Sequence, residues 1–189
     1  MRRIAIFLFL GFVCVRATNS FAQVEPSAHR GQISLTAGGL ASGFQPDYAG
    51  GLVPGSSPNH LFGLGAYVDV RFTRWLQLEA EGRWLRFNSY LEITEDNYLI
   101  GPRVPIHTFR WREATPYGKV LIGMGKMTFE YNDAYGHFTD IAYGGGVDLK
   151  LSKRFTLRAF DFEYQQWPNW VNTSLHPYGG SIGIGYKVF

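Results

Sequence analysis

Two pairs of side chains in this sequence have the types and spacing that catalysis uses. Ser174 and His176 stand two residues apart and offer a nucleophile beside a base. Glu79 and Glu81 have the same spacing and resemble the paired carboxylates of general acid–base catalysis. Alternate residues of a β-strand share one face, so a salt-bridge ladder explains the second pair more simply. We therefore expect no catalytic residue and no enzyme activity.

Metal and cofactor chemistry has even less support. The five histidines are scattered without the spacing of metal ligands: His29, His60, His107, His137 and His176. The single cysteine, Cys14, lies in an apolar N-terminal run, so it forms neither a disulfide framework nor a thiolate metal site. The glycine-rich segments 123–125 and 144–146 fall inside predicted strands, not at the turns that cradle phosphates. We expect no metal and no cofactor.

The N-terminus has the order of a secretory signal. Two arginines open the chain, and the apolar run 4–15 that follows is too short to cross a bilayer as a helix. Small residues then precede a plausible cleavage point after Ala22. The sequence predicts a signal peptide at 1–22 and one domain at 23–189.

Charge and composition narrow the class of domain. The chain has 18 Lys and Arg residues against 15 Asp and Glu, but three of the arginines belong to the expected signal. The remainder is balanced and shows no concentrated basic stretch, so we expect no nucleic-acid partner. Aromatic residues make up 16% of the chain and charged residues only 17%, and there are 23 glycines. This profile is typical of a membrane β-barrel.

Alternation with period two is the dominant pattern after the signal. In the segments 62–72 and 76–84, apolar residues alternate with charged or small ones, as in strands with two different faces. We assign Thr73 and Arg74 as the link between the two runs, which predicts a tight hairpin with a two-residue link.

About eight such segments follow one another, each near the length that a tilted membrane strand needs. They are 32–41, 62–72, 76–84, 98–106, 117–129, 139–151, 155–165 and 178–189. Short links at 73–74, 107–114 and 152–154 alternate with long ones at 42–59, 87–97, 130–138 and 166–177. Hydrocarbon leaves an open sheet edge without hydrogen-bond partners, so the sheet must close. The sequence predicts an all-β, closed antiparallel transmembrane β-barrel with short periplasmic turns and longer extracellular loops, located in the outer membrane.

Charged residues and glycines share one face of these strands, which indicates a crowded lumen. We expect a paired ionic network inside the barrel, made of Asp69, Glu79, Glu81, Arg83, Arg103, Lys119, Asp148, Lys150 and Arg158. Arg158 and Asp161 have opposite parity although both must avoid lipid, so a β-bulge is predicted near Ala159 and Phe160. The alternative is a soluble β-sandwich whose charged faces meet water.

Aromatic residues gather at two places. Many lie near strand ends, which predicts two girdles at the membrane interfaces. Others lie in the two longest loops, where exposed rings suit surface recognition or rest on the membrane rim: Phe44, Tyr48, Trp167 and Trp170. The sequence leaves these two readings open.

Three segments carry a family resemblance: YLIGPR at 98–103, TPYGKVLIG at 115–123 and GIGYKVF at 183–189. The chain resembles the small eight-stranded outer-membrane barrels of the OmpA/OmpX type. The resemblance implies a monomer surrounded by outer-membrane lipid and lipopolysaccharide, with a structural or surface-interaction role. It also implies that Phe189, in the C-terminal strand, is read by the barrel-assembly machinery. Two alternatives remain: a lipid A-modifying enzyme acting through Ser174 and His176, or a narrow pore past Arg83 and Arg103.

Overall fold

The computed structural model describes residues 33–47, 60–87, 93–106, 113–129, 134–170 and 173–189. The regular structure in these residues is entirely β. No helix among them is long and apolar enough to span a membrane. The expected signal peptide, residues 1–22, lies outside this description, so its cleavage stays a prediction.

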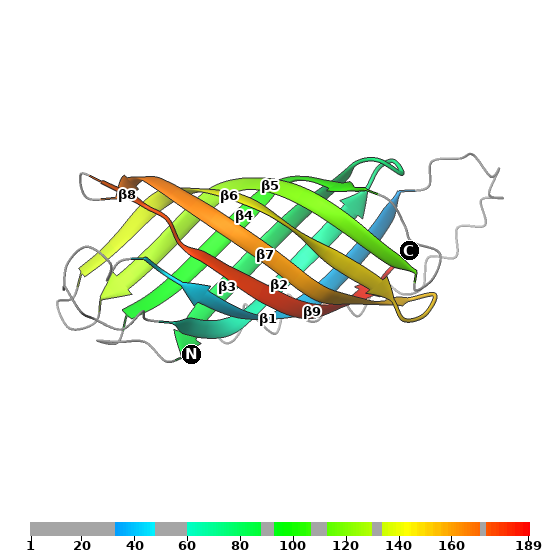
Figure 1. The fold of residues 1–189 in the computed structure, drawn as a ribbon, viewed down its shortest axis with the longest axis horizontal. Helices are drawn as coiled ribbons and strands as arrows, with labels where there is room; N and C mark the ends of the chain where they lie inside the picture. The colour runs from blue at the N-terminus through cyan, green and yellow to red at the C-terminus, as the bar shows by residue number, and fades with distance from the viewer. Residues whose placement is uncertain (1–32, 48–59, 88–92, 107–112, 130–133, 171–172) are drawn as a thin grey trace, which may run out of the picture. The chain divides into compact units, whose positions relative to one another are not determined.

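Strands that follow one another in the sequence pair antiparallel with their neighbours and close a ring (Figure 1). The strands are β1 (Ser34–Gln45), β2 (Leu61–Arg71), β3 (Gln77–Phe87), β4 (Ile93–Pro105), β5 (Ala114–Phe129), β6 (Ala134–Lys150), β7 (Phe155–Trp170), β8 (Thr173–Leu175) and β9 (Tyr178–Lys187). Eight of them form the wall, and the short β8 pairs only with the end of β7. The predicted eight-stranded closed antiparallel barrel is confirmed.

The first and last strands close the wall. β1 pairs with β9 from Thr36 opposite Lys187 to Gln45 opposite Tyr178. The pairing continues past β9, because the Leu35 amide donates to the Phe189 carbonyl over 3.2 Å and the Val188 amide donates to the Leu35 carbonyl over 2.8 Å. Closure removes the sheet edges, which would otherwise leave backbone groups unpaired in hydrocarbon.

Several strands run further toward the long loops than the sequence predicted. β1 reaches Gln45 instead of residue 41, β4 begins at Ile93 instead of 98, and β7 reaches Trp170 instead of 165. Paired backbone continues beyond the alternating apolar residues that marked the strands, as in the pairing of Phe129 with Ala134. The apolar pattern marks the lipid-facing part of a strand and not its hydrogen-bonded end.

The β2–β3 turn is longer than the predicted two-residue link. The strands end at Arg71 and begin again at Gln77, and the amides of Phe72 and Thr73 donate to the Leu76 carbonyl over 3.3 and 3.2 Å. The Thr73 hydroxyl accepts from the Trp75 and Leu76 amides over 3.1 and 3.0 Å. The prediction was wrong because this hydroxyl closes a wider turn.

The predicted β-bulge is confirmed in β7. Phe160 pairs with Val147 and Arg158 pairs with Asp148, so Ala159 is the extra residue on the β7 side. The pairing of β7 with β9 also breaks between Arg158 and Asp161. This one-residue insertion lets both charged side chains point inward, where they are 0% and 1% exposed.

The two faces of the wall have opposite chemistry. Outward residues include Leu64, Ile122 and Ile182, each more than half exposed. Inward residues between them include charged side chains such as Glu79 and Arg83, which are fully buried. A soluble sandwich has the reverse arrangement, with apolar side chains inside, so this alternative is wrong.

Exposed aromatic side chains occupy both ends of the wall. Near the short turns, Phe155 meets Tyr186 edge to face with ring centroids 5.3 Å apart, and the Arg154 guanidinium donates to the Tyr186 hydroxyl over 2.9 Å. In the halves of β3 and β4 nearer the long loops, the Trp84 indole donates to the Tyr98 hydroxyl over 3.0 Å. These positions agree with two interfacial girdles.

Candidate functional site

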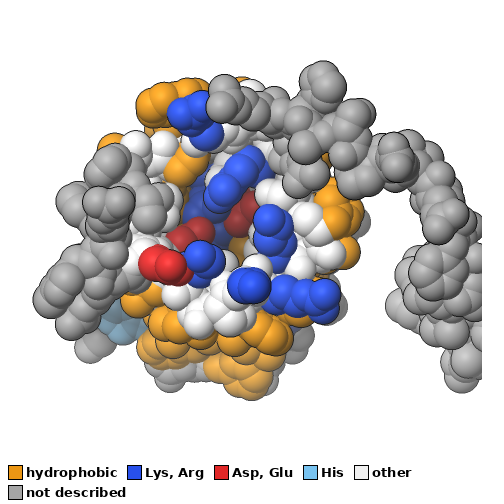
Figure 2. Space-filling view, turned by 90° about the vertical axis from the view of Figure 1, so that its right-hand side faces the viewer, with side chains coloured by type: hydrophobic (Ala, Val, Ile, Leu, Met, Phe, Trp, Pro, Cys, Tyr) orange, Lys and Arg blue, Asp and Glu red, His pale blue; other side chains and the backbone are white. Residues whose placement is uncertain are grey.

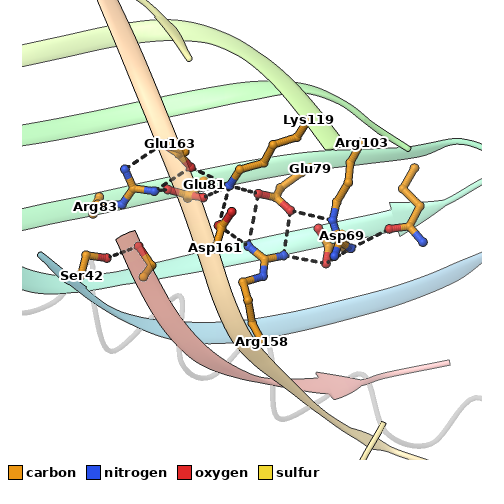
Figure 3. Close-up of polar contacts among 12 residues, drawn as sticks. Ser42, Asp69, Glu79, Glu81, Arg83, Arg103, Lys119, Arg158, Asp161 and Glu163 are labelled. Atoms are coloured by element: carbon orange, nitrogen blue, oxygen red, sulfur yellow. Dashed lines mark hydrogen bonds and ion pairs between the residues drawn. The ribbon is translucent and has the colours of Figure 1, made fainter. Parts of the chain in front are cut away.

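The interior of the barrel is filled by a network of buried charges, which we call the lumen network (Figure 3). Its four cations are each at most 3% exposed: Arg83, Arg103, Lys119 and Arg158. They come from β3, β4, β5 and β7, and each strand projects its cation inward through the two-residue repeat. Figure 3 shows these cations meeting carboxylates from facing strands along the barrel interior.

Lys119 is the centre of the lumen network. Its ammonium lies 2.9 Å from Glu79, 3.1 Å from Glu81, 2.6 Å from Asp161 and 2.5 Å from Glu163, measured from Nζ to the nearest carboxylate oxygen. The first three carboxylates are close enough together to hold a metal ion. The ammonium already contacts all three, so the chain supplies the cation of this cluster itself.

Arg158 and Arg103 fill the half of the lumen nearer the short turns. Arg158 contacts Glu79 over 2.7 Å and Asp69 over 3.2 Å. Arg103 donates to Asp69 over 3.1 Å and to Asp148 over 2.6 Å. Their guanidinium groups also lie over aromatic rings, Arg158 at 3.8 Å from the Tyr67 centroid and Arg103 at 3.6 Å from Tyr117.

Arg83 closes the other half of the lumen network. Its two terminal nitrogens donate to the two oxygens of Glu163 over 3.0 and 2.8 Å, a bidentate pair. Arg83 also contacts Glu81, and its guanidinium lies 4.4 Å from the centroid of the Phe44 ring. These two parallel hydrogen bonds hold the Arg83 side chain in one orientation across the lumen.

Glycines in the wall make room for these large side chains. A Cβ at Gly144 would lie 2.9 Å from the Glu163 side chain, and one at Gly125 would overlap the Trp167 ring. The sequence pattern that placed glycines beside charged residues therefore reflects real crowding in the lumen.

Acidic groups outnumber basic ones in the described lumen. Four buried cations face seven carboxyl side chains that are at most 7% exposed. These carboxyl groups belong to Asp69, Glu79, Glu81, Glu95, Asp140, Asp161 and Glu163. Two of these carboxyl groups, Glu95 and Asp140, lie toward the long loops, where both oxygens of Glu95 are buried without a hydrogen-bond donor. Asn97 donates to Asp140 over 3.1 Å and to Gln165 over 2.8 Å. Glu95 and Asn97 fall outside the predicted strand 98–106, although Glu95, Asn97 and Leu99 alternate as in a strand.

An apolar cluster covers the lumen network at the end with the long loops. Ile93, Met127, Trp167 and Leu175 pack there as buried side chains, and Phe138 stacks on Trp167 with centroids 5.8 Å apart. The expected exposure of Trp167 was wrong, as was that of Phe44, which is 1% exposed and packs on Leu61 and Leu85. Both strands extend beyond their predicted ends, so strand parity turns these rings inward.

Comparison with known proteins agrees with this architecture. The sequence matches the family model described as the outer membrane protein beta-barrel domain over residues 5–187. The chain belongs to this family. As an outer-membrane barrel, it has its apolar wall in outer-membrane lipid. No curated protein sequence matches it.

Solved structures of other small barrels have the same fold. Neisserial surface protein A shares 11% identity with a TM-score of 0.59, covering 82% of this chain and 96% of its own. OprG from Pseudomonas aeruginosa shares 14% identity with a TM-score of 0.51, covering 85% and 97%. Ail, the attachment invasion locus protein of Yersinia pestis, was solved with the heparin analogue sucrose octasulfate and shares 18% identity with a TM-score of 0.50, covering 84% and 99%. At these identities the likeness shows the fold alone.

The remaining predicted site residues lie apart from the lumen network or outside the described residues. Lys150 was expected in the lumen network, but its side chain is 53% exposed at the short-turn end and pairs with Glu113 over 2.9 Å. Its strand position has the inward parity, yet it is the last residue of β6 and lies beyond the packed interior. Phe189 is 63% exposed. Tyr48 and the side chain of Trp170 lie outside the described residues.

Ser174 and His176 do not form a catalytic pair in the described structure. Ser174 is exposed in β8, and no hydrogen bond joins it to His176 among the described residues. The His176 ring instead stacks on Tyr164 with centroids 5.8 Å apart, and its backbone amide donates to Asp47 over 3.3 Å. These contacts tie the first and last loop regions of the outer-membrane barrel together.

Proposed function

We propose that this protein is a sealed outer-membrane barrel with a structural and surface-interaction role, and that it neither conducts nor catalyses. The lumen network supports this most directly. Arg83 and Arg103 stand at its two ends, are 0% and 3% exposed, and each contacts at least two carboxylates. Eight strands leave an interior just wide enough for side chains to fill.

A conductance measurement tests the sealed lumen. Purified barrel reconstituted into a planar lipid bilayer is expected to give no discrete current steps, while a porin in the same bilayer gives them. A pore needs a water path past Arg83 and Arg103, and both are held in buried ion pairs. Steady, ohmic current steps from the wild-type protein would contradict the proposal.

The surface-interaction role is supported by the fold and by what the similar proteins are. One is described as a surface protein, and another as an attachment protein bound to a heparin analogue.

The recognition candidates that remain are Tyr48 and Trp170, since Phe44 and Trp167 are buried. Cells displaying the barrel are expected to adhere to immobilised heparin, and Trp170→Ala is expected to reduce adhesion without loss of assembled barrel. Equal adhesion by cells without the barrel would contradict this role.

The absence of catalysis has its own test. Lipid A from cells with and without the barrel is expected to have the same mass spectrum, because Ser174 and His176 are not joined in the structure. A new acylation state that disappears in Ser174→Ala would establish the enzyme alternative.

We also infer that the barrel is a monomer and that the assembly machinery reads its C-terminal strand. The position of β9 supports the second inference, because β9 and the residues after it close the wall against β1. Replacing Phe189 with Ala is expected to lower the amount of assembled protein in the membrane while the refolded protein keeps its stability.

A further inference from the structure

The end of the barrel with the short turns opens into a cavity of about 450 Å³. Figure 2 looks into this end and shows Lys and Arg side chains around a hollow, with acidic side chains both at the rim and deeper inside and the apolar wall outside. The lining comes from the short-turn ends of seven strands and includes Arg71, Arg74, Gln77, Arg103 and Lys150. We call this cavity the basic mouth.

The cations at the rim are available for a ligand. Arg71 and Arg74 are exposed and take part in no ion pair among the described residues. Lys150 pairs with Glu113, but both side chains are more than half exposed, so this pair is weak and water-screened. Arg71 and Arg74 belong to the β2–β3 turn, whereas Lys150 ends β6, so the sequence shows no concentrated basic stretch and only the closed barrel brings the three together.

The floor of the basic mouth does not cancel this positive charge. Asp69 and Asp148 face the cavity, and both are paired with Arg103. Glu95 and Asp140, which form no ion pair among the described residues, lie at the opposite end of the lumen beyond Arg83. The lining as a whole has four cations, Arg71, Arg74, Arg103 and Lys150, against three carboxylates, Asp69, Glu113 and Asp148, so a net positive charge remains.

The walls determine what kind of anion fits. Ser34, Thr36 and Thr156, whose side chains carry hydroxyl groups, line the cavity, and Gln77 adds an amide. Most small-molecule pockets are lined mainly by apolar side chains, and this one is not. Its volume nevertheless falls in the range of small-molecule sites. A wall of this size in which polar and apolar surface are about equal suits a ligand rich in hydroxyl groups.

We propose that the basic mouth binds a small periplasmic anion that carries hydroxyl groups, of the class of sugar phosphates. Arg71 and Arg74 hold the phosphate through charged hydrogen bonds, and the hydroxyl-bearing walls hold the sugar. The lumen network closes the floor, so the site is a dead-end binding pocket and not the entrance of a transport path. This inference goes beyond the structural role proposed above.

The experiment titrates glucose 6-phosphate into the refolded barrel in zwitterionic detergent and follows amide chemical shifts by NMR. Glucose and inorganic phosphate are titrated separately as partial ligands. The double variant Arg71→Ala/Arg74→Ala removes the two rim arginines. The double variant Lys153→Ala/Arg154→Ala removes the same charge from the β6–β7 turn, on the other side of the ring of strands and outside the cavity. Gel mobility with and without boiling checks that each variant is folded.

The expected result is saturable binding of glucose 6-phosphate, with shifts at residues that line the basic mouth, and weaker binding of each partial ligand. Arg71→Ala/Arg74→Ala is expected to weaken binding at least about tenfold, and Lys153→Ala/Arg154→Ala less than about twofold. Equal loss in the two variants would overturn the proposal, because it would show general charge attraction. So would the absence of saturation, or equal binding of glucose or of inorganic phosphate.

Discussion

At the scale of single residues, two buried glutamates of the lumen network have opposite roles. Glu163 accepts the bidentate hydrogen bonds of Arg83 and contacts Lys119, whereas both oxygens of Glu95 lack a donor. Glu163→Gln is expected to lower the free energy of unfolding by about 3 kcal/mol, because it breaks a buried bidentate ion pair and leaves Arg83 with Glu81 as its one charged partner among the described residues. Urea unfolding in detergent or lipid vesicles measures this.

Glu95→Gln is the matched control, since it makes the same chemical change at another fully buried position of the lumen. It is expected to change the free energy of unfolding by less than about 1 kcal/mol, because no hydrogen bond to the carboxylate is lost. Equal destabilisation by the two variants would contradict the distinction between paired and surplus carboxylates.

Trp167 tests the apolar cluster that covers the lumen. Trp167→Ala is expected to cost about 3–5 kcal/mol of unfolding free energy, because a ring with 0% exposure leaves a cavity between Ile93 and Met127. Trp75→Ala, at a residue that is 65% exposed, is the control and should cost clearly less. If Trp167 had the exposed recognition role that the sequence suggested, Trp167→Ala would cost no more unfolding free energy than Trp75→Ala. That result would contradict the account.

The residues of the lumen network were largely predictable, and the reason is strand parity. Alternation placed Glu79, Glu81 and Arg83 on one face, and the structure brings them together. Parity does not show where a strand ends, so the sequence alone leaves Phe44 and Trp167 in predicted loops. Nor does it show partners across the lumen, so the pairing of Arg83 with Glu163, 80 residues away, came only from the closed fold.

At the scale of elements, the β-bulge in β7 keeps its charged residues out of lipid. Deleting Ala159 restores a regular register and turns either Arg158 or Asp161 outward. A charge facing lipid near the membrane centre costs about 2–4 kcal/mol. The deletion is expected to abolish the compact, heat-modifiable band on gels, whereas Ala159→Gly should retain it. A folded deletion variant would contradict this role of the bulge.

In two short turns, a side-chain hydroxyl accepts hydrogen bonds from two backbone amides. Thr73 accepts two backbone amides in the β2–β3 turn, and Ser152 accepts those of Arg154 and Phe155 in the β6–β7 turn over 3.2 and 3.0 Å. Thr73→Ala and Ser152→Ala are each expected to lower the free energy of unfolding by about 1 kcal/mol. Thr73→Ser keeps the hydroxyl and should be close to wild type in the same unfolding measurement.

Element boundaries were less predictable than the elements themselves. The apolar alternation extends only over the part of each strand that lies in lipid. It therefore marked all eight wall strands but stopped short of the long-loop ends of β1, β4 and β7. Hydrogen bonding between strands continues in water, where side-chain pattern no longer constrains it. The bulge was predictable because two charges of opposite parity in one strand require it.

At the scale of the whole barrel, one arrangement explains both the wall and the interior. Closure through β1 and β9 satisfies the backbone in hydrocarbon, and it also encloses the charges that the strands project inward. The same closure gathers basic residues from separate turns into one mouth, which no local pattern in the sequence reveals. Closure of the sheet was predictable, because hydrocarbon offers no partners to an open edge. The apolar cluster at the long-loop end and the basic mouth at the short-turn end were not predictable.

The central claim is that lipid touches alternate residues of each strand and that the residues between them face a sealed interior. NMR cross-relaxation between side-chain methyl groups and lipid acyl chains, in nanodiscs and without any mutation, tests it most directly. Val120 and Ile122 of β5, which are 47% and 55% exposed, are expected to give cross-peaks to acyl protons, and Leu121 between them, with 0% exposure, none. Acyl contacts at Leu121, or none at Ile122, would contradict the account.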